Sequence, residues 1–174
     1  AASTQASSTA SSSAPDTTTP PPLPDVSKLV PSVQGQITAQ HERLVKTLAA
    51  PGTTLLERAA DFGQYGRLVM AAQLPDAARA AFERTQALDP SDYRWPYYLA
   101  QLARSQGDLD AAASHFARVL QLKPDDMDTL VWLGDVNLAA GHPDVAAPLF
   151  SRALQLDPNR SEEHTSELQS HLNL

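Results

Sequence analysis

The sequence lacks cysteine and any long apolar run, and its basic residues are few. Without cysteine, the 174 residues supply no disulfide, no thiolate metal ligand and no cysteine nucleophile. No stretch approaches the roughly 18 apolar residues that a membrane-spanning helix needs, so direct membrane insertion is not expected. The 13 lysines and arginines are outnumbered by 20 acidic residues, which gives a net charge of -7. Because nucleic-acid binding depends on clustered basic residues, nucleic acid is not an expected partner.

Core-forming residues are also scarce near the N-terminus. Residues 1–24, AASTQASSTASSSAPDTTTPPPLP, contain one leucine and one charged residue, Asp16. Such a segment cannot bury enough apolar surface to offset the entropy lost on ordering, so residues 1–30 are predicted to form a disordered Ser/Thr/Pro-rich tether. This composition is common after a removed signal peptide or a lipoprotein anchor, which favours an exported bacterial protein, periplasmic or membrane-tethered. The alternatives are a linker after another domain and a cytoplasmic location.

What the sequence does have is an internal repeat with a period of 34 residues. A Leu-x-Pro sequence recurs at this interval, ending at Pro90, Pro124 and Pro158. With that proline as position 32, the units span residues 59–92, 93–126 and 127–160. Position 8 is small, position 20 is alanine and position 24 is phenylalanine in every unit. These residues are Gly66, Ala100 and Gly134; Ala78, Ala112 and Ala146; and Phe82, Phe116 and Phe150. Self-similarity at this period predicts a repeat architecture.

The pattern resembles the tetratricopeptide repeat (TPR), a helix-turn-helix unit, over residues 59–160. The resemblance implies an all-α fold, a right-handed α-solenoid of three TPR units without a sheet. Small side chains at positions 8 and 20 allow the two helices of a unit to approach closely, and the phenylalanine fills the space toward the next unit. The proline at position 32 cannot continue the second helix. The chain departs from the pattern at Gln73, where glycine is usual, and at Pro96 and Pro148, which lie inside expected helices.

Local signals predict the helix boundaries. Residues 31–50 place Ile37 and Leu44 on one face at helical spacing, so this stretch is expected to form a helix that caps the N-terminal end of the array. The repeat region is expected to begin at Thr54, because Thr54 and Glu57 have the spacing of a capping box, and to span residues 54–160. Further helices are expected over residues 54–72, 75–88, 109–122 and 143–156. Another is expected to begin at Arg94 or Trp95, after a cap at Ser91 or Asp92. A helix capped by Asp125 or Asp126 is expected to run to about residue 140.

The C-terminal residues have a different origin. Residues 160–170, RSEEHTSELQS, match the translated adapter of a common short-read sequencing library at eleven consecutive positions. We therefore expect residues 160–174 to be a non-native, adapter-derived tail and exclude them from functional arguments, as is done for fusion scars. On this interpretation the natural chain continues differently. The alternative function, an N-terminal accessory module of a larger, truncated enzyme, depends on that continuation.

No group of residues predicts an active site, a cofactor or a metal ion. The histidines, among them His41 and His115, never occur as a pair at zinc-ligand spacing. The acidic residues around Asp108 and Asp125 fall at expected helix starts, where carboxylates cap the helix and face the positive end of its dipole. The sequence therefore favours a protein–protein interaction scaffold and not an enzyme.

In the family that the chain resembles, positions 2, 5, 9, 12 and 13 of each first helix line a concave groove. They carry Ala60, Gly63, Arg67, Met70 and Ala71 in the first unit; Arg94, Tyr97, Gln101, Arg104 and Ser105 in the second; and Asp128, Val131, Asp135, Leu138 and Ala139 in the third. Tyr98 and Trp132, at position 6, flank the groove. The predicted binding set is Arg67, Arg94, Tyr97, Tyr98, Gln101, Arg104, Val131, Trp132 and Asp135.

Arginines and aromatic residues in this set favour an acidic or aromatic segment of another protein as the partner. The residues of the two-carboxylate clamp found in the family's chaperone-tail binders are absent, so a C-terminal carboxylate is not the favoured ligand. The competing interpretation is that Tyr97, Tyr98 and Trp132 simply pack between neighbouring helices, because aromatic residues dominate cores as well as interfaces. The oligomeric state and the identity of the partner are left open.

Overall fold

The computed structural model describes residues 14–157. The first 13 residues of the predicted tether and the predicted adapter-derived tail lie outside the described residues. Within residues 14–157 the chain forms helices and no strand, as the repeat pattern predicts. The helices are α1 Pro31–Ala49, α2 Leu55–Ala71, α3 Pro75–Leu88, α4 Arg94–Ser105, α5 Leu109–Leu122, α6 Met127–Ala139 and α7 Pro143–Leu156.

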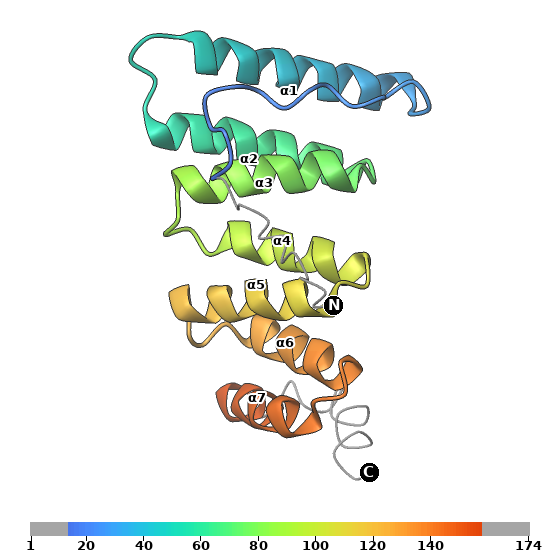
Figure 1. Cartoon of the computed structure of the whole chain (residues 1–174), viewed down its shortest axis with the longest axis vertical. Coiled ribbons are helices and arrows are strands. Elements are labelled where there is room, and N and C mark those ends of the chain that lie inside the picture. The colour runs from blue at the N-terminus through green and yellow to red at the C-terminus, as the bar shows by residue number, and fades with distance from the viewer. Residues whose placement is uncertain (1–13, 158–174) are drawn as a thin grey trace, which may run out of the picture.

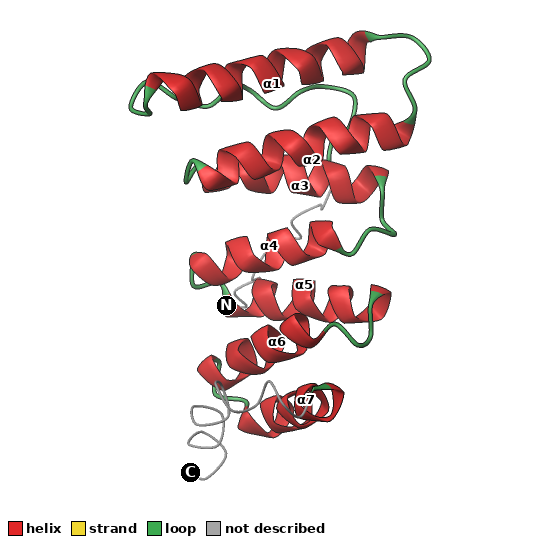
Figure 2. Ribbon diagram, turned by 180° about the vertical axis from the view of Figure 1, so that it is seen from behind, coloured by secondary structure: helices red, strands yellow, loops and turns green. Residues whose placement is uncertain are grey.

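The helices stack in chain order from α1 to α7 along the long axis of the molecule (Figures 1 and 2). The closest pairs are α2 with α3, α4 with α5 and α6 with α7, which correspond to the three sequence repeats. Each pair then packs against the next through α3 and α4 or through α5 and α6. An array in which contacts join successive elements is an α-solenoid.

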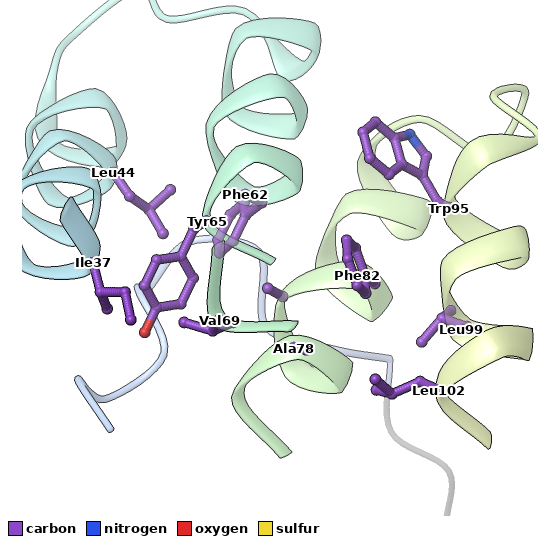
Figure 3. Close-up of a cluster of buried hydrophobic side chains, with 11 residues drawn as sticks. Ile37, Leu44, Phe62, Tyr65, Val69, Ala78, Phe82, Trp95, Leu99 and Leu102 are labelled. Carbon is purple, nitrogen blue, oxygen red and sulfur yellow. The ribbon is translucent and has the colours of Figure 1, made fainter. Parts of the chain in front are cut away.

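The repeated small and aromatic residues form the contact inside each unit. A Cβ atom added to Gly66 on α2 would lie 2.7 Å from Cε1 of Phe82 on α3, so only glycine leaves room for that ring. Gly134 meets Phe150 in the same way in the third unit. Phe82 also stacks on Tyr98 of the next unit, with ring centroids 5.0 Å apart. The phenylalanine therefore packs both within its unit and toward the next one, in the cluster drawn in Figure 3.

The turn inside the first unit adopts a conformation that normally requires glycine. Gln73 has φ = 60°, and its equivalents in the other units, Gly107 and Gly141, have φ = 77° and 81°. The left-handed conformation is open to glycine but costs roughly 1–2 kcal/mol for a residue with a Cβ atom. Repeat geometry thus holds Gln73 in a conformation that its own preference disfavours.

The two helical prolines are accommodated differently. Pro96 is the third residue of α4, where its missing N–H would have no partner inside the helix in any case. Pro148 lies in the interior of α7 and removes one hydrogen bond of that helix. The N-cap residue of α4 is Tyr93, whose side chain makes no capping hydrogen bond. Asp92, one of the two expected caps, accepts a hydrogen bond from the backbone N–H of Arg94, the first residue of the helix, at 2.9 Å.

Helix α1 covers the first repeat, and residues 14–30 lie along the same end of the molecule (Figure 1). Ile37 and Leu44 of α1 are fully buried against α2. The composition of residues 14–30 predicts a disordered tether, whereas the structure places this stretch against the helices with Pro21 buried and Leu29 packed on the core. Its backbone carbonyls accept hydrogen bonds from helix side chains, an interaction that composition does not reveal.

Candidate interaction surface

One face of α4 carries three polar side chains joined by hydrogen bonds. Tyr97, Gln101 and Arg104 are spaced by four and three residues, so they project from the same side of the helix. The amide Nε2 of Gln101 donates to the hydroxyl of Tyr97 at 3.2 Å. The Nε and Nη2 groups of Arg104 donate to Oε1 of Gln101 at 3.2 and 3.1 Å. This continuous network fixes the exposed guanidinium of Arg104 in one orientation.

Arg104 also links the second unit to the third. Its guanidinium carbon lies 4.2 Å from the centroid of the Trp132 ring on α6, which is a cation–π geometry. Trp132 is half-buried and packs against the cluster that contains Ala100 and Phe116. We call Tyr97, Gln101, Arg104 and Trp132 the α4–α6 cluster. It spans two repeats and presents an aromatic ring and a cation side by side.

Tyr97 and Tyr98 pack differently although they are adjacent in sequence. The Tyr97 ring meets Phe116 edge to face, with centroids 5.9 Å apart, and its hydroxyl belongs to the α4–α6 cluster. The Tyr98 ring stacks on Phe82 at an interplanar angle of 12° and approaches Trp95 at 6.3 Å. Tyr98 is therefore a packing residue between the first two units, whereas Tyr97 contributes to both the core and the surface.

The two other arginines of the predicted set lie outside the α4–α6 cluster. Arg67 on α2 is exposed and donates to the amide oxygen of Gln64. Arg94 pairs with Asp92, with 2.5 Å between Nη2 and Oδ2, and its guanidinium lies 5.0 Å from the Trp95 ring. Burial raises the pKa of Asp92, but the hydrogen bonds from Arg94 outweigh burial and leave that pKa below its usual value. Arg94 already has an acidic partner within the chain.

The remaining predicted residues divide between packing and surface. Val131 of α6 packs against the cluster formed by Ala146 and Phe150. Asp135, also on α6, is partly buried. Gly63, expected on the groove of the first unit, is buried under Trp95, and a Cβ atom there would collide with the indole. Trp95 therefore fills the space at this position, so Gly63 offers no groove surface in the first unit.

Sequence analysis missed a second set of repeated residues. Arginine occupies position 26 of every unit, at Arg84, Arg118 and Arg152. Arg118 donates to the backbone carbonyl of Pro90, and Arg152 pairs with Asp125, so these two arginines hold the connections that lead into their own units. The 34-residue spacing of these arginines is visible in the sequence and could have identified the set.

A cleft of about 550 Å³ between the end of α1 and the start of α2 was also not predicted. It is lined by both signs of charge, including Arg43, Lys46 and Asp61. The Asp61 carboxylate is buried, accepts a hydrogen bond from Thr47 at 2.5 Å and pairs with Arg43 at 3.0 Å. The charge of Asp61 is thus balanced within the chain.

No group of three or more acidic or histidine side chains lies close enough to bind a metal ion within residues 14–157. No helix in this same stretch combines the length and the apolar character required to cross a bilayer.

Comparisons with known proteins agree with the 34-residue repeat pattern. The family model described as "Tetratricopeptide repeat" matches residues 66–127 and 100–161, together more than half of the chain. No curated protein matches the sequence. Two crystal structures of MamA align with TM-scores of 0.61 and 0.62, at 20% and 21% identity, over 75% and 72% of this chain and 67% and 69% of those chains. YrrB, described as a TPR protein with an unusual peptide-binding site, aligns with a TM-score of 0.58 at 20% identity, over 74% of this chain and 64% of that chain. These similarities establish the common fold.

Proposed function

Because the chain belongs to the tetratricopeptide repeat family, a class of protein-interaction scaffolds, we propose that its α4–α6 cluster binds a segment of a partner protein. The observation that carries the proposal is the position of the Arg104 guanidinium over the Trp132 ring, across the joint between two repeats. Arginine and tryptophan are the residue types most enriched among binding hot spots. In this chain the Arg104 and Trp132 side chains already lie against each other without a bound partner.

The chemistry of the cluster favours an acidic segment that also carries an aromatic residue. The hydrogen bonds of Arg104 to Gln101 engage Nε and Nη2, and the exposed guanidinium retains further N–H donors that suit a carboxylate. The ring of Trp132 offers apolar area beside that charge. The peptide-binding site named for YrrB, a protein of the same fold, supports a peptide ligand for this chain.

Synthetic peptides test the proposal. We expect a short peptide with glutamate flanking phenylalanine or tyrosine to bind more tightly than its glutamine counterpart, because the charge on Arg104 has no equivalent attraction for an amide. Arg104→Ala and Trp132→Ala should each weaken binding by about 1–3 kcal/mol in a calorimetric titration. Arg104→Lys should retain only part of the affinity, since lysine cannot present a planar pair of donors.

Arg118→Ala serves as the matched control. Arg118 lies on α5 of the same unit and contacts the Pro90 carbonyl, outside the α4–α6 cluster. Its replacement should leave peptide affinity unchanged. Equal losses in Arg118→Ala and Arg104→Ala, with helicity preserved in both, would reject the α4–α6 cluster as the binding site.

We also propose that the scaffold works outside the bacterial cytoplasm, in the periplasm or tethered to a membrane. The support is compositional: residues 1–13, which precede the segment packed on the helices, contain only Ala, Ser, Thr and Gln, a composition common in tethers that space a domain from an anchor. Fractionation of cells that express the natural gene tests this location. Recovery in the cytoplasmic fraction alone would contradict it.

A further inference from the structure

Residues 14–30, here called the N-terminal segment, accept hydrogen bonds from helix side chains through backbone carbonyls. His41 of α1 donates from Nε2 to the carbonyl of Pro21 at 2.8 Å, and Arg84 of α3 donates from Nε to the carbonyl of Asp16 at 2.7 Å. Gln34 donates to the carbonyl of Leu29 at 2.7 Å. Side chains that bind carbonyl oxygens contact the backbone, which every polypeptide segment has.

Burial along the segment is selective. Pro21 is buried, whereas the neighbouring Leu23 keeps 42% of its surface exposed. Val26 and Leu29 pack against the core cluster of α1, α2 and α3. The surface therefore combines carbonyl-binding donors with a site that encloses one proline, a combination suited to the extended conformation that proline favours.

Arg84 distinguishes the first unit from the other two. Arg118 and Arg152, at the same repeat position, bind the connections that lead into their own units. Arg84 instead binds Asp16, a residue that lies 68 positions away and belongs to no repeat. In the first unit, the arginine at this repeat position thus contacts the N-terminal segment and not the connection between two helices.

A buried polar group next to the segment has no hydrogen-bond partner within residues 14–157. The hydroxyl of Tyr65 on α2 is fully buried and makes no hydrogen bond to any described residue. Its ring lies 5.5 Å from that of His41, the residue that holds Pro21. A buried hydroxyl without a partner costs about 1–3 kcal/mol. A backbone carbonyl of a different occupant could satisfy it.

We propose that His41, Tyr65 and Arg84 form a second binding site for an extended, proline-containing polypeptide, and that the chain's own residues 14–30 occupy this site in the structure. The site shares no residue with the α4–α6 cluster. Because the N-terminal segment is tethered, its effective concentration is on the order of millimolar. A partner segment must therefore compete with it, which keeps the site closed to weak ligands.

The test uses the full chain and a fluorescein-labelled synthetic peptide of residues 14–30. In the unaltered protein the tethered segment should block the labelled peptide. Pro21→Asp in the protein replaces the buried proline by a charged residue and should release the tethered segment, leaving the binding surface intact. Fluorescence anisotropy should then report peptide affinity at least about tenfold higher than in the unaltered protein.

Two further variants separate binding from a general change. Adding His41→Ala and Arg84→Ala to the Pro21→Asp protein should remove the gain, because both backbone-binding donors are lost. Adding Arg118→Ala instead, the arginine at the same repeat position in the second unit, should leave the gain intact. Equal peptide binding by the unaltered and Pro21→Asp proteins, or binding by neither, would overturn the proposal.

Discussion

Replacing Gln73 by glycine should stabilise the protein. Gln73 has φ = 60°, in a region that costs a residue with a Cβ atom roughly 1–2 kcal/mol and glycine nothing. The exposed side chain makes no hydrogen bond to any residue of 14–157 that the substitution would remove. Glycine also makes the unfolded chain more flexible, which offsets about 0.4–1 kcal/mol of the gain. We therefore expect a net increase of about 0.5–1 kcal/mol in the free energy of unfolding.

Urea denaturation followed by circular dichroism measures this change. The midpoint should rise while the slope of the transition stays constant, since the substitution alters no buried surface. For a chain of this size the melting temperature should rise by about 1–4 °C. Gly107→Gln is the reciprocal control, because it places a side chain at φ = 77° and should destabilise the second unit. A stabilising effect of Gly107→Gln, or a destabilising one of Gln73→Gly, would refute the conformational argument.

Three other substitutions test the packing and the electrostatics. Gly66→Ala should destabilise by about 1–3 kcal/mol, because its Cβ atom would meet the buried Phe82 ring at 2.7 Å; thermal unfolding measures the loss. Tyr65→Phe should raise stability or leave it unchanged, since it removes a buried hydroxyl that has no partner among the described residues and whose pKa burial raises to about 12. Asp126 caps α6, and although burial raises its pKa, hydrogen bonds from Lys123 and Thr129 outweigh burial and lower it below the usual value. The ionised Asp126 carboxylate therefore contributes to the free energy of unfolding above about pH 4, and this contribution is lost as the pH falls through the lowered pKa. Asp126→Asn should flatten that part of the curve of stability against pH.

The repeat pattern predicted the helices closely because helix ends in this chain depend on local signals. The prolines at the starts of α3 and α7 and the capping box at Thr54 define helix starts that the structure reproduces. The departure at Gln73 was visible in the sequence, but its conformation was not, since the surrounding repeat imposes it against the local preference. At α4 the N-cap position is Tyr93, one residue after the expected Asp92, although the Asp92 carboxylate does accept the backbone N–H of Arg94.

The candidate site was predicted less completely, because it depends on contacts between units. Repeat position alone put Gly63 on the groove, yet the indole of Trp95 from the next unit covers it. It also grouped Tyr98 with Tyr97, although the two rings pack against different partners. Amino-acid composition could not predict the placement of residues 14–30, because the hydrogen bonds from His41 and Arg84 go to backbone carbonyls, which every residue has.

The two tryptophans allow the most direct test of the proposed binding surface. Each indole N–H gives a separate NMR signal in the full chain, one from Trp132 in the α4–α6 cluster and one from the buried Trp95. Titration with a glutamate-and-phenylalanine peptide should shift the Trp132 signal and leave the Trp95 signal in place, and Arg104→Ala should reduce that shift. A peptide that binds while the Trp132 signal stays unchanged would contradict the account.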